Sequence, residues 1–235
     1  MDFSYVSTHE DYEQVLKLRR DAYVDSGKLP SATSADKCAD IFDSRARILV
    51  ARYRGETVGS LRLVFPGSMD KIEQEDHVSL PASFPPREEL VEITRVCTHP
   101  RFRGSDLLKL LFAQATKAVV ESKRRYVVGS SNMEHLPIYK RIGFKPTDIF
   151  FKHQGFNGQE HVVFAGDVTR VISGLDIDPI TWNVMYSDVA RFLQEHKLLE
   201  MDASTALRIR AFKLLSPIAR IWAPRVRARK KIASA

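Results

Sequence analysis

Apolar residues recur at helical spacing in several segments of the chain. Between residues 9 and 25, Val15, Leu16, Leu18 and Ala22 lie on one side of a helix, and Thr8 precedes it as an N-cap with Asp11 as its partner. A longer stripe of the same period runs through 107–122. We therefore predict two long amphipathic helices in these segments.

Short β-rich runs separate these helices. They lie at 48–53, 57–65, 90–97, 126–129, 149–153 and 161–165. Arg54-Gly55-Glu56 and Asn157-Gly158 are typical of hairpin turns. A short helix at 136–142 ends at Gly143. The order of helices and strands predicts a mixed α/β (α+β) domain rather than a series of equal βαβ units.

Two loops and a helical C-terminal region complete the organisation. Residues 26–45 and 66–88 read as loops, and the second is a proline-rich insertion long enough to be functional. Two helical stretches follow, at 179–199 and 203–223. We expect one domain over 1–170 and a helical extension over 171–235.

Charge is distributed unevenly. The chain has 235 residues, 44% hydrophobic and 28% charged, which excludes a wholly disordered or fibrous protein. Residues 202–235 contain nine Lys or Arg and one acid, a net charge of +8, whereas residues 1–201 carry −1. Such a tail indicates an anionic partner, namely a membrane surface, an acidic protein or a nucleic acid, or else a solvated helix.

Features that the sequence lacks bear on its cellular location and on metal binding. The polar N-terminus is unlike a signal peptide, no apolar run reaches 18 residues, and two cysteines make no disulfide framework. We expect a cytoplasmic protein. The seven histidines show no metal-ligand spacing, so no metal site is expected, and serine-hydrolase and NTP-loop motifs are missing.

Two segments contain the residue types that chemistry requires. In 91–104 a strand leads through Pro100 and Arg103-Gly104 into the long helix, and a helix N-terminus beside arginines binds phosphate well. In 132–144 a short helix carries Tyr139 and closes with Gly143-Phe144.

Together these segments resemble the GNAT acyltransferase superfamily, over about residues 8–168. The resemblance implies a GNAT-like fold with a central twisted, mostly antiparallel sheet, flanked by helices and splayed between two strands. The arm of an acyl thioester donor would enter the splay, and backbone N–H groups there would hold the oxyanion. The donor-binding residues implied are Val96, Arg101, Arg103, Gly104 and Ser105.

Upstream motifs resemble one branch of that superfamily, the acyl-homoserine-lactone synthases and long-chain N-acyl amino acid synthases. The residues are Leu18-Arg19-x-x-x-Tyr23, Asp40-x-x-Asp43, Gly59-x-x-Arg62-Leu63 and Glu92-x-Thr94-Arg95. Tyr23 stands where the branch has Phe, and Thr94 where it has Ser. The usual Trp after the first helix is absent, with Leu29 nearest, which favours the amino-acid synthases.

The turn before the long helix bears on the donor. Acetyl-CoA users of the superfamily have small residues where this chain has Asp106. A carboxylate beside a diphosphate is unfavourable, so acyl carrier protein is favoured over acyl-CoA. Alternatively, Asp106 only complements the helix dipole.

Glu92 is the candidate general base for attack of an amine on the thioester. Strand alternation puts Glu92 and Thr94 on one face and Arg95 on the other. Arg95 is then expected to hold structure, pairing with Asp40 or Asp43. The alternative for Glu92 is a salt bridge with Arg62 or Arg19.

The remaining candidates concern the leaving group and the acceptor. Tyr139 is either the acid for the leaving thiol or a packing residue. Arg19 and Arg62 are candidates for binding the acceptor's carboxylate, with Tyr23 beside them.

The tail has an apolar stripe through Leu207, Ala211, Leu214 and Leu215, with basic residues around it and Pro217 as a break. This predicts contact of 203–231 with a membrane surface or partner, or packing on the domain.

The sequence thus favours an N-acyltransferase that joins a long-chain acyl group, from acyl carrier protein, to an amino acid. One alternative is a CoA-dependent GNAT acetyltransferase of a small amine or protein lysine. Another is an adaptor that binds membrane or nucleic acid through its tail, although no nucleic acid is expected as partner.

Overall fold

A single seven-stranded sheet organises the protein. The computed structural model describes residues 1–198, 202–215 and 217. The strands are β1 (Asp2–Tyr5), β2 (Ala46–Tyr53), β3 (Glu56–Val64), β4 (Leu90–Thr98), β5 (Tyr126–Asn132), β6 (Lys145–His153) and β7 (Gln159–Asp167). Their order is β1-β2-β3-β4-β5-β7-β6, and among these described strands only the β4–β5 pair is parallel.

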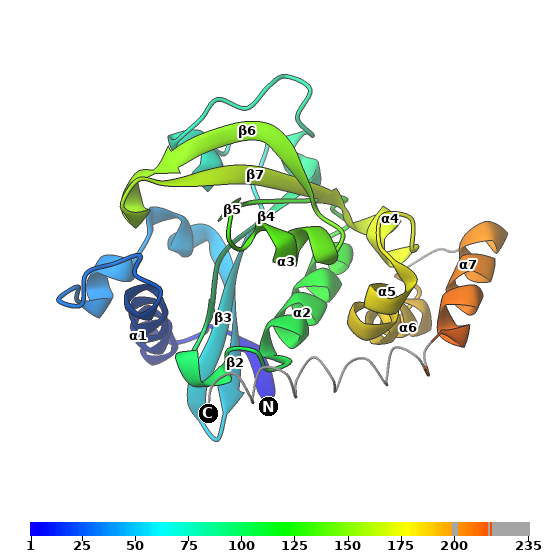
Figure 1. Cartoon of the computed structure of the whole chain (residues 1–235), viewed down its shortest axis with the longest axis horizontal. Helices are drawn as coiled ribbons and strands as arrows, with labels where there is room; N and C mark the ends of the chain where they lie inside the picture. The colour runs from blue at the N-terminus through cyan, green and yellow to red at the C-terminus, as the bar shows by residue number, and fades with distance from the viewer. Residues whose placement is uncertain (199–201, 216, 218–235) are drawn as a thin grey trace.

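Helices cover both faces of this sheet (Figure 1). They are α1 (His9–Asp25), α2 (Leu107–Glu121), α3 (Leu136–Arg141), α4 (Val168–Ile172), α5 (Pro179–Met185), α6 (Ser187–Glu195) and α7 (Ala203–Leu214). Figure 1 shows α1 on one side of β2 and β3 and α2 on the other, with the β6–β7 hairpin arching above. This is the mixed α/β, mostly antiparallel architecture that the sequence predicts.

Most predicted elements are confirmed to within a few residues. Thr8 caps α1, since its hydroxyl accepts the backbone N–H of Asp11 at 3.1 Å. The sequence analysis did not predict β1, α4 or the short 3-10 helices in the two loops. The helix expected over 179–199 is two helices, because the chain leaves helical geometry at Tyr186.

The sheet opens between its two parallel strands. β4 and β5 pair only through Leu90–Glu92 and Tyr126–Val128, although both strands continue. Gly129 is the next residue of β5, and a Cβ there would lie 2.6 Å from the carbonyl oxygen of Ile93. A side chain at this position would force its neighbours to shift, so glycine is favoured there. The splay that the GNAT resemblance implies is therefore present, with glycine at its apex.

The Tyr-x-x-x-Gly-Phe segment packs one face of the sheet. Gly143 ends α3 with a φ of 97°, a conformation that favours glycine. Tyr139 and Phe144 then stack on the Phe164 ring, with centroids 4.2 and 5.6 Å away.

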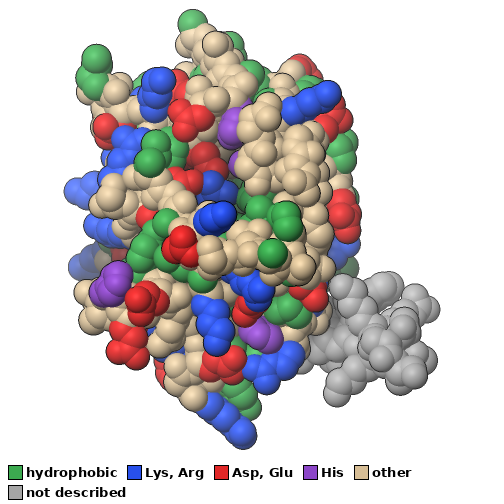
Figure 2. All heavy atoms as spheres, turned by 90° about the vertical axis from the view of Figure 1, so that its left-hand side faces the viewer, with side chains coloured by type: hydrophobic (Ala, Val, Ile, Leu, Met, Phe, Trp, Pro, Cys, Tyr) green, Lys and Arg blue, Asp and Glu red, His purple; other side chains and the backbone are tan. Residues whose placement is uncertain are grey.

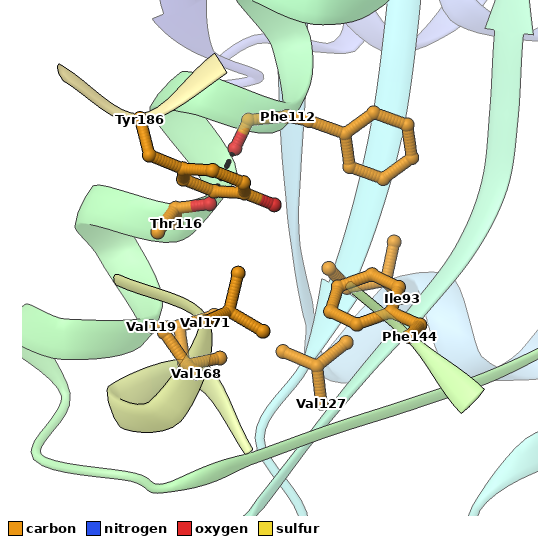
Figure 3. A pocket seen from close by; sticks show the side chains of 9 residues that line it. All are labelled: Ile93, Phe112, Thr116, Val119, Val127, Phe144, Val168, Val171 and Tyr186. Atoms are coloured by element: carbon orange, nitrogen blue, oxygen red, sulfur yellow. Dashed lines mark hydrogen bonds between the residues drawn. The ribbon is translucent and has the colours of Figure 1, made fainter. Parts of the chain in front are cut away.

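A small apolar cavity lies deeper on this face (Figure 3). It is bounded by α2, β4, β5, α4 and Tyr186, and its volume is about 10 Å³. That is about the space of one water molecule. Thr116 of α2 is among the residues that line it, and its hydroxyl donates to the carbonyl of Phe112 at 2.8 Å. An acyl chain does not fit this space as it stands.

The helical extension packs against the rest of the protein. Trp182, Tyr186, Leu193 and Ile209 belong to the same hydrophobic cluster as the α2 face of the sheet. The expected boundary near residue 170 falls within α4 and stays a prediction.

The outer side of α7 is apolar and exposed. Leu207 and Leu214 are 70% and 80% exposed, while Ile209 is buried. The predicted stripe therefore faces outward where it is described, and its continuation through 218–231 lies outside the described residues. In the described part of the chain, no helix is both long and apolar enough to cross a bilayer.

Candidate active site

A bulge in β4 sets the geometry of the site. Ser60 pairs with Cys97 and Arg62 with Thr94, so Leu61 opposes two residues, Arg95 and Val96. Arg95 has a φ of 50°, which is left-handed backbone. The extra residue turns the Arg95 side chain to the same side as Thr94. Our expectation from simple alternation, that Arg95 faces away from Glu92 and Thr94, is wrong for this reason.

Two aspartates hold arginines beneath the sheet. Asp40 and Asp43 form a capping box: Asp40 Oδ1 accepts the Phe42 N–H at 2.8 Å, and Asp43 Oδ2 accepts the Asp40 N–H at 3.1 Å. The Asp43 carboxylate accepts hydrogen bonds from both Nη atoms of Arg19, at 2.7 and 2.9 Å. Asp40 pairs with Arg95, as the sequence predicts. The Asp-x-x-Asp spacing thus builds the turn and presents two carboxylates at once.

Arg19 and Arg62 lie inside this network. Both are fully buried. Arg62 pairs with Asp40 and Asp43 at 2.9 and 3.1 Å, and its Nε donates to Thr94 Oγ1 at 2.9 Å. The prediction that one of these arginines is available to an acceptor's carboxylate is therefore not met, because carboxylates of the protein already occupy them.

Glu73, which the sequence analysis did not identify, completes the network from the 66–88 insertion. Its carboxylate contacts Arg62 Nη2, and its Oε1 lies 2.7 Å from Arg95 Nη2 and 3.6 Å from His153 Nε2. Burial alone raises its pKa, but Arg95, His153 and Arg62 outweigh that effect and hold the pKa well below its usual range. Glu73 is therefore a permanent anion at neutral pH.

Glu92 is a different kind of carboxyl group. It is fully buried, and one oxygen accepts the backbone N–H of Glu73 at 2.8 Å. Burial, and then the charge of Glu73, raise the pKa of Glu92 to about 8. Within the described residues Glu92 forms no salt bridge and its Oε2 has no hydrogen-bond partner. The alternative of a salt bridge with Arg19 or Arg62 is thus wrong, and one oxygen is left to act on a proton.

Aromatic and histidine rings of the β6–β7 hairpin gather beside His153, which faces Glu73, and the sequence analysis did not identify them. Phe156, in the hairpin turn, lies 4.2 Å from the His153 ring and 5.0 Å from Tyr23 of α1, between centroids. His161 of β7 lies 5.0 Å from His153. His153 and His161 are not spaced along the sequence like the ligands of a metal site. They come together because β6 pairs with β7. Figure 2 shows basic, acidic and histidine side chains close together on this side of the molecule.

Tyr23 and Cys97 form the edge of the site near the end of β4. Both are buried, and they lie close enough for each side chain to influence the pKa of the other. Burial raises the pKa of each. Both groups therefore stay neutral at physiological pH.

The turn before α2 lies beyond the end of β4. Gly104 has a φ of 78°, and the Ser105 hydroxyl accepts the Leu107 N–H at 3.2 Å. Arg103 pairs with Asp25, and Arg101 with Glu56 at 2.8 Å, both near the surface. Val96 packs with the α2-side core. The donor residues implied by the resemblance thus lie between the last residues of β4 and the N-terminus of α2, and both arginines already pair with carboxylates.

The surroundings of Tyr139 are compatible with both alternatives, a packing residue and a proton donor. Its ring stacks on Phe164, as the packing alternative requires. Burial, and then the nearby Cys97 thiol, raise the pKa of its hydroxyl. The hydroxyl thus keeps its proton and lies toward the end of β4.

Among residues 1–198, 202–215 and 217, no group of three or more His, Cys, Asp or Glu side chains has a geometry that could hold a metal ion. The chemistry available from this part of the chain is that of a buried carboxyl group, a tyrosine hydroxyl and backbone N–H groups beside an open strand pair.

A family model decides the assignment. The model for the N-acyl amino acid synthase FeeM matches residues 14–165, more than half of the chain. The chain belongs to this family. It is an N-acyltransferase, and its motifs place it in the branch that the sequence analysis names.

Solved structures agree on the fold. FeeM, an N-acyl amino acid synthase from uncultured soil microbes, is similar with a TM-score of 0.58 at 13% identity, covering 81% of this chain and 97% of its own. TofI in an apo form gives 0.56 at 19%, covering 77% and 99%. An acyl-CoA N-acyltransferase from Pseudomonas aeruginosa gives 0.52 at 21%, covering 71% and 99%. No curated protein matches the sequence.

Proposed function

We propose that this N-acyltransferase joins a long-chain acyl group to the amine of an amino acid and takes the acyl group from acyl carrier protein. The observation that carries the proposal is Glu92, a buried carboxyl group beside the splay with a pKa of about 8 and one oxygen that has no hydrogen-bond partner among the described residues. A base of this strength suits an amine, which is protonated at neutral pH and must lose a proton to attack.

The reaction is a simple acyl transfer. The amine nitrogen attacks the thioester carbonyl carbon, a C–N bond forms, and Glu92 takes the amine proton directly or through water. The tetrahedral oxyanion is held by backbone N–H groups of β4 that β5 does not pair. The C–S bond then breaks, and Tyr139 is the candidate to protonate the thiolate. The products are an N-acyl amino acid and the free thiol of the carrier.

The donor assignment rests on the turn before α2. Asp106 is the residue immediately before α2, where acetyl-CoA users of the superfamily have a small residue. A carrier protein presents one phosphodiester rather than a diphosphate, so this carboxylate opposes it less. The basic tail also favours an acidic carrier protein. Acyl-CoA as donor is the alternative.

The test compares Glu92→Gln with Glu89→Gln, which changes an exposed acid immediately before β4. Purified protein is given dodecanoyl carrier protein or dodecanoyl-CoA with a mixture of the twenty amino acids, and N-acyl products are measured by mass spectrometry. We expect product from the carrier donor and a loss on the order of a hundredfold or more in kcat for Glu92→Gln only. Near-normal turnover in that variant would refute the base assignment, and product from CoA alone would refute the donor assignment.

A further inference from the structure

A half-buried lysine that has no ionic partner among the described residues lies at the outer edge of the site. Lys28 follows the C-terminus of α1, where Gly27 has a φ of 69°. The Gly27 N–H donates to the Val24 carbonyl at 3.0 Å and the Lys28 N–H to the Tyr23 carbonyl at 2.8 Å. This pair of bonds is a Schellman motif. It fixes the start of the Lys28 side chain relative to Tyr23.

The ammonium group of Lys28 rests on two aromatic rings. Its Nζ lies 5.1 Å from the centroid of Phe156 and 5.9 Å from that of Tyr23. In the described part of the chain, no carboxylate lies within 4 Å of it. Burial lowers the pKa of Lys28. The rings offset only part of the cost of desolvating the cation, so an anion from outside would be bound favourably here.

Unpaired polar atoms continue from Lys28 toward Glu92. His161 is 4% exposed, and neither of its ring nitrogens has a partner among the described residues. His153 Nδ1 and Glu92 Oε2 are also without partners there. Buried polar groups normally find hydrogen bonds, so several orphans in one place indicate a polar molecule that binds there.

The contacts connect this place to the proposed base. Lys28 lies over Phe156, Phe156 contacts His153, His153 faces Glu73, and the backbone of Glu73 binds Glu92. Arg101 and Arg103, near the donor turn, already have carboxylate partners. Lys28 is thus a cation on this series of contacts that has no carboxylate partner among the described residues, whereas Arg19 and Arg62 already pair with carboxylates.

We propose that Lys28 recognises the carboxylate of the acceptor, which lies beneath Phe156 and His161 with its amine toward Glu92. The inference rests on the proposed function and adds a residue that selects amino acids over simple amines.

The test uses acceptor pairs that differ only in the carboxylate. Leucine is compared with 3-methylbutylamine, phenylalanine with phenethylamine and tyrosine with tyramine, at saturating dodecanoyl donor. Lys28→Met removes the charge, Lys28→Arg restores it, and Lys17→Met removes an exposed lysine of α1 as a control. We expect Lys28→Met to lower kcat/KM for the amino acids on the order of tenfold to a hundredfold, through KM. The amines should change less than about twofold, and Lys28→Arg should recover most of the loss.

A binding measurement separates this inference from the proposed function. Calorimetric titration of leucine, phenylalanine and tyrosine into the protein without donor should show binding that Lys28→Met weakens and Lys17→Met does not. Equal losses for amino acids and amines would overturn the inference, as would a rise only in the KM of the donor, which would assign Lys28 to the phosphodiester. Lys28-dependent amino-acid binding without acyl transfer would support the inference and count against the proposed function.

Discussion

Replacing Glu73 with glutamine removes the one charge that Arg62, Arg95 and His153 share. Breaking a buried ion pair costs about 3–5 kcal/mol, and we expect the lower end because Asp40 still pairs with both arginines. A loss of about 3 kcal/mol lowers the melting temperature by about 6–12 °C in a protein of this size. We therefore expect the variant to remain folded, which a thermal unfolding curve checks directly.

The same change acts on Glu92. The Glu73 charge raises the pKa of Glu92, so its removal lowers that pKa toward neutrality. With a pKa of about 8, roughly one tenth of Glu92 is ionised at pH 7. A fall on the order of one pH unit would raise that share to about one half. At pH 7 the kcat/KM of Glu73→Gln should therefore be a larger fraction of its maximum over pH than it is in the unchanged protein, even if that maximum is lower.

The assay is kcat/KM between pH 6 and 9.5, with thermal unfolding recorded at each pH. Glu75→Gln is the matched control, because it breaks the ion pair with Arg87 at 2.6 Å in the same insertion. Ionisation of the acceptor amine is common to all three enzymes and cancels in the comparison. In the pH profile of kcat/KM, we expect the rising limb of Glu73→Gln to move to lower pH. A limb that stays in place or moves to higher pH would refute the coupling between Glu73 and Glu92.

Three further predictions test the splay, Tyr139 and α7. Gly129→Ala puts a Cβ 2.6 Å from the Ile93 carbonyl, so we expect the free energy of unfolding in a denaturant titration to fall by about 1–3 kcal/mol and the KM of the donor to rise. Unchanged values would contradict the close approach of the two strands. Tyr139→Phe keeps the stack on Phe164, so the melting temperature should hold while kcat falls about tenfold, and an unchanged kcat would leave Tyr139 a packing residue. Glutamate at both Leu207 and Leu214 should reduce co-sedimentation with vesicles of anionic phospholipid, whereas equal binding would exclude this face of α7 from membrane contact.

The sequence predicts the elements of the fold because periodicity and turn residues are local signals. Thr8, Gly143 and Asn157-Gly158 mark the ends of elements where the structure has them. β1 and α4 were missed because four or five residues contain too little of a period to recognise.

The site was predicted only in part. Glu92, Thr94, Asp40 and Arg95 were found as motif residues, and the pair between Asp40 and Arg95 is confirmed. The prediction of the side to which Arg95 points was wrong, because one extra residue in the bulge reverses the alternation of the strand. No local sequence pattern marks this bulge. Glu73 and His161 were missed because long-range packing, rather than spacing along the chain, brings them to Glu92 and His153.

The contact between the 66–88 insertion and Glu92 has a consequence for local unfolding. Burial, and then the charge of Glu73 in the insertion, make Glu92 a weak acid, whereas the Glu73 N–H that its carboxylate accepts acts in the opposite direction. When the insertion detaches, water reaches the carboxyl group and its pKa returns toward that of an ordinary glutamate. The protein then carries a poor base as well as an open site. Competence for proton transfer is therefore a property of the closed state, and hydrogen exchange of the Glu73 amide would report how often that state is lost.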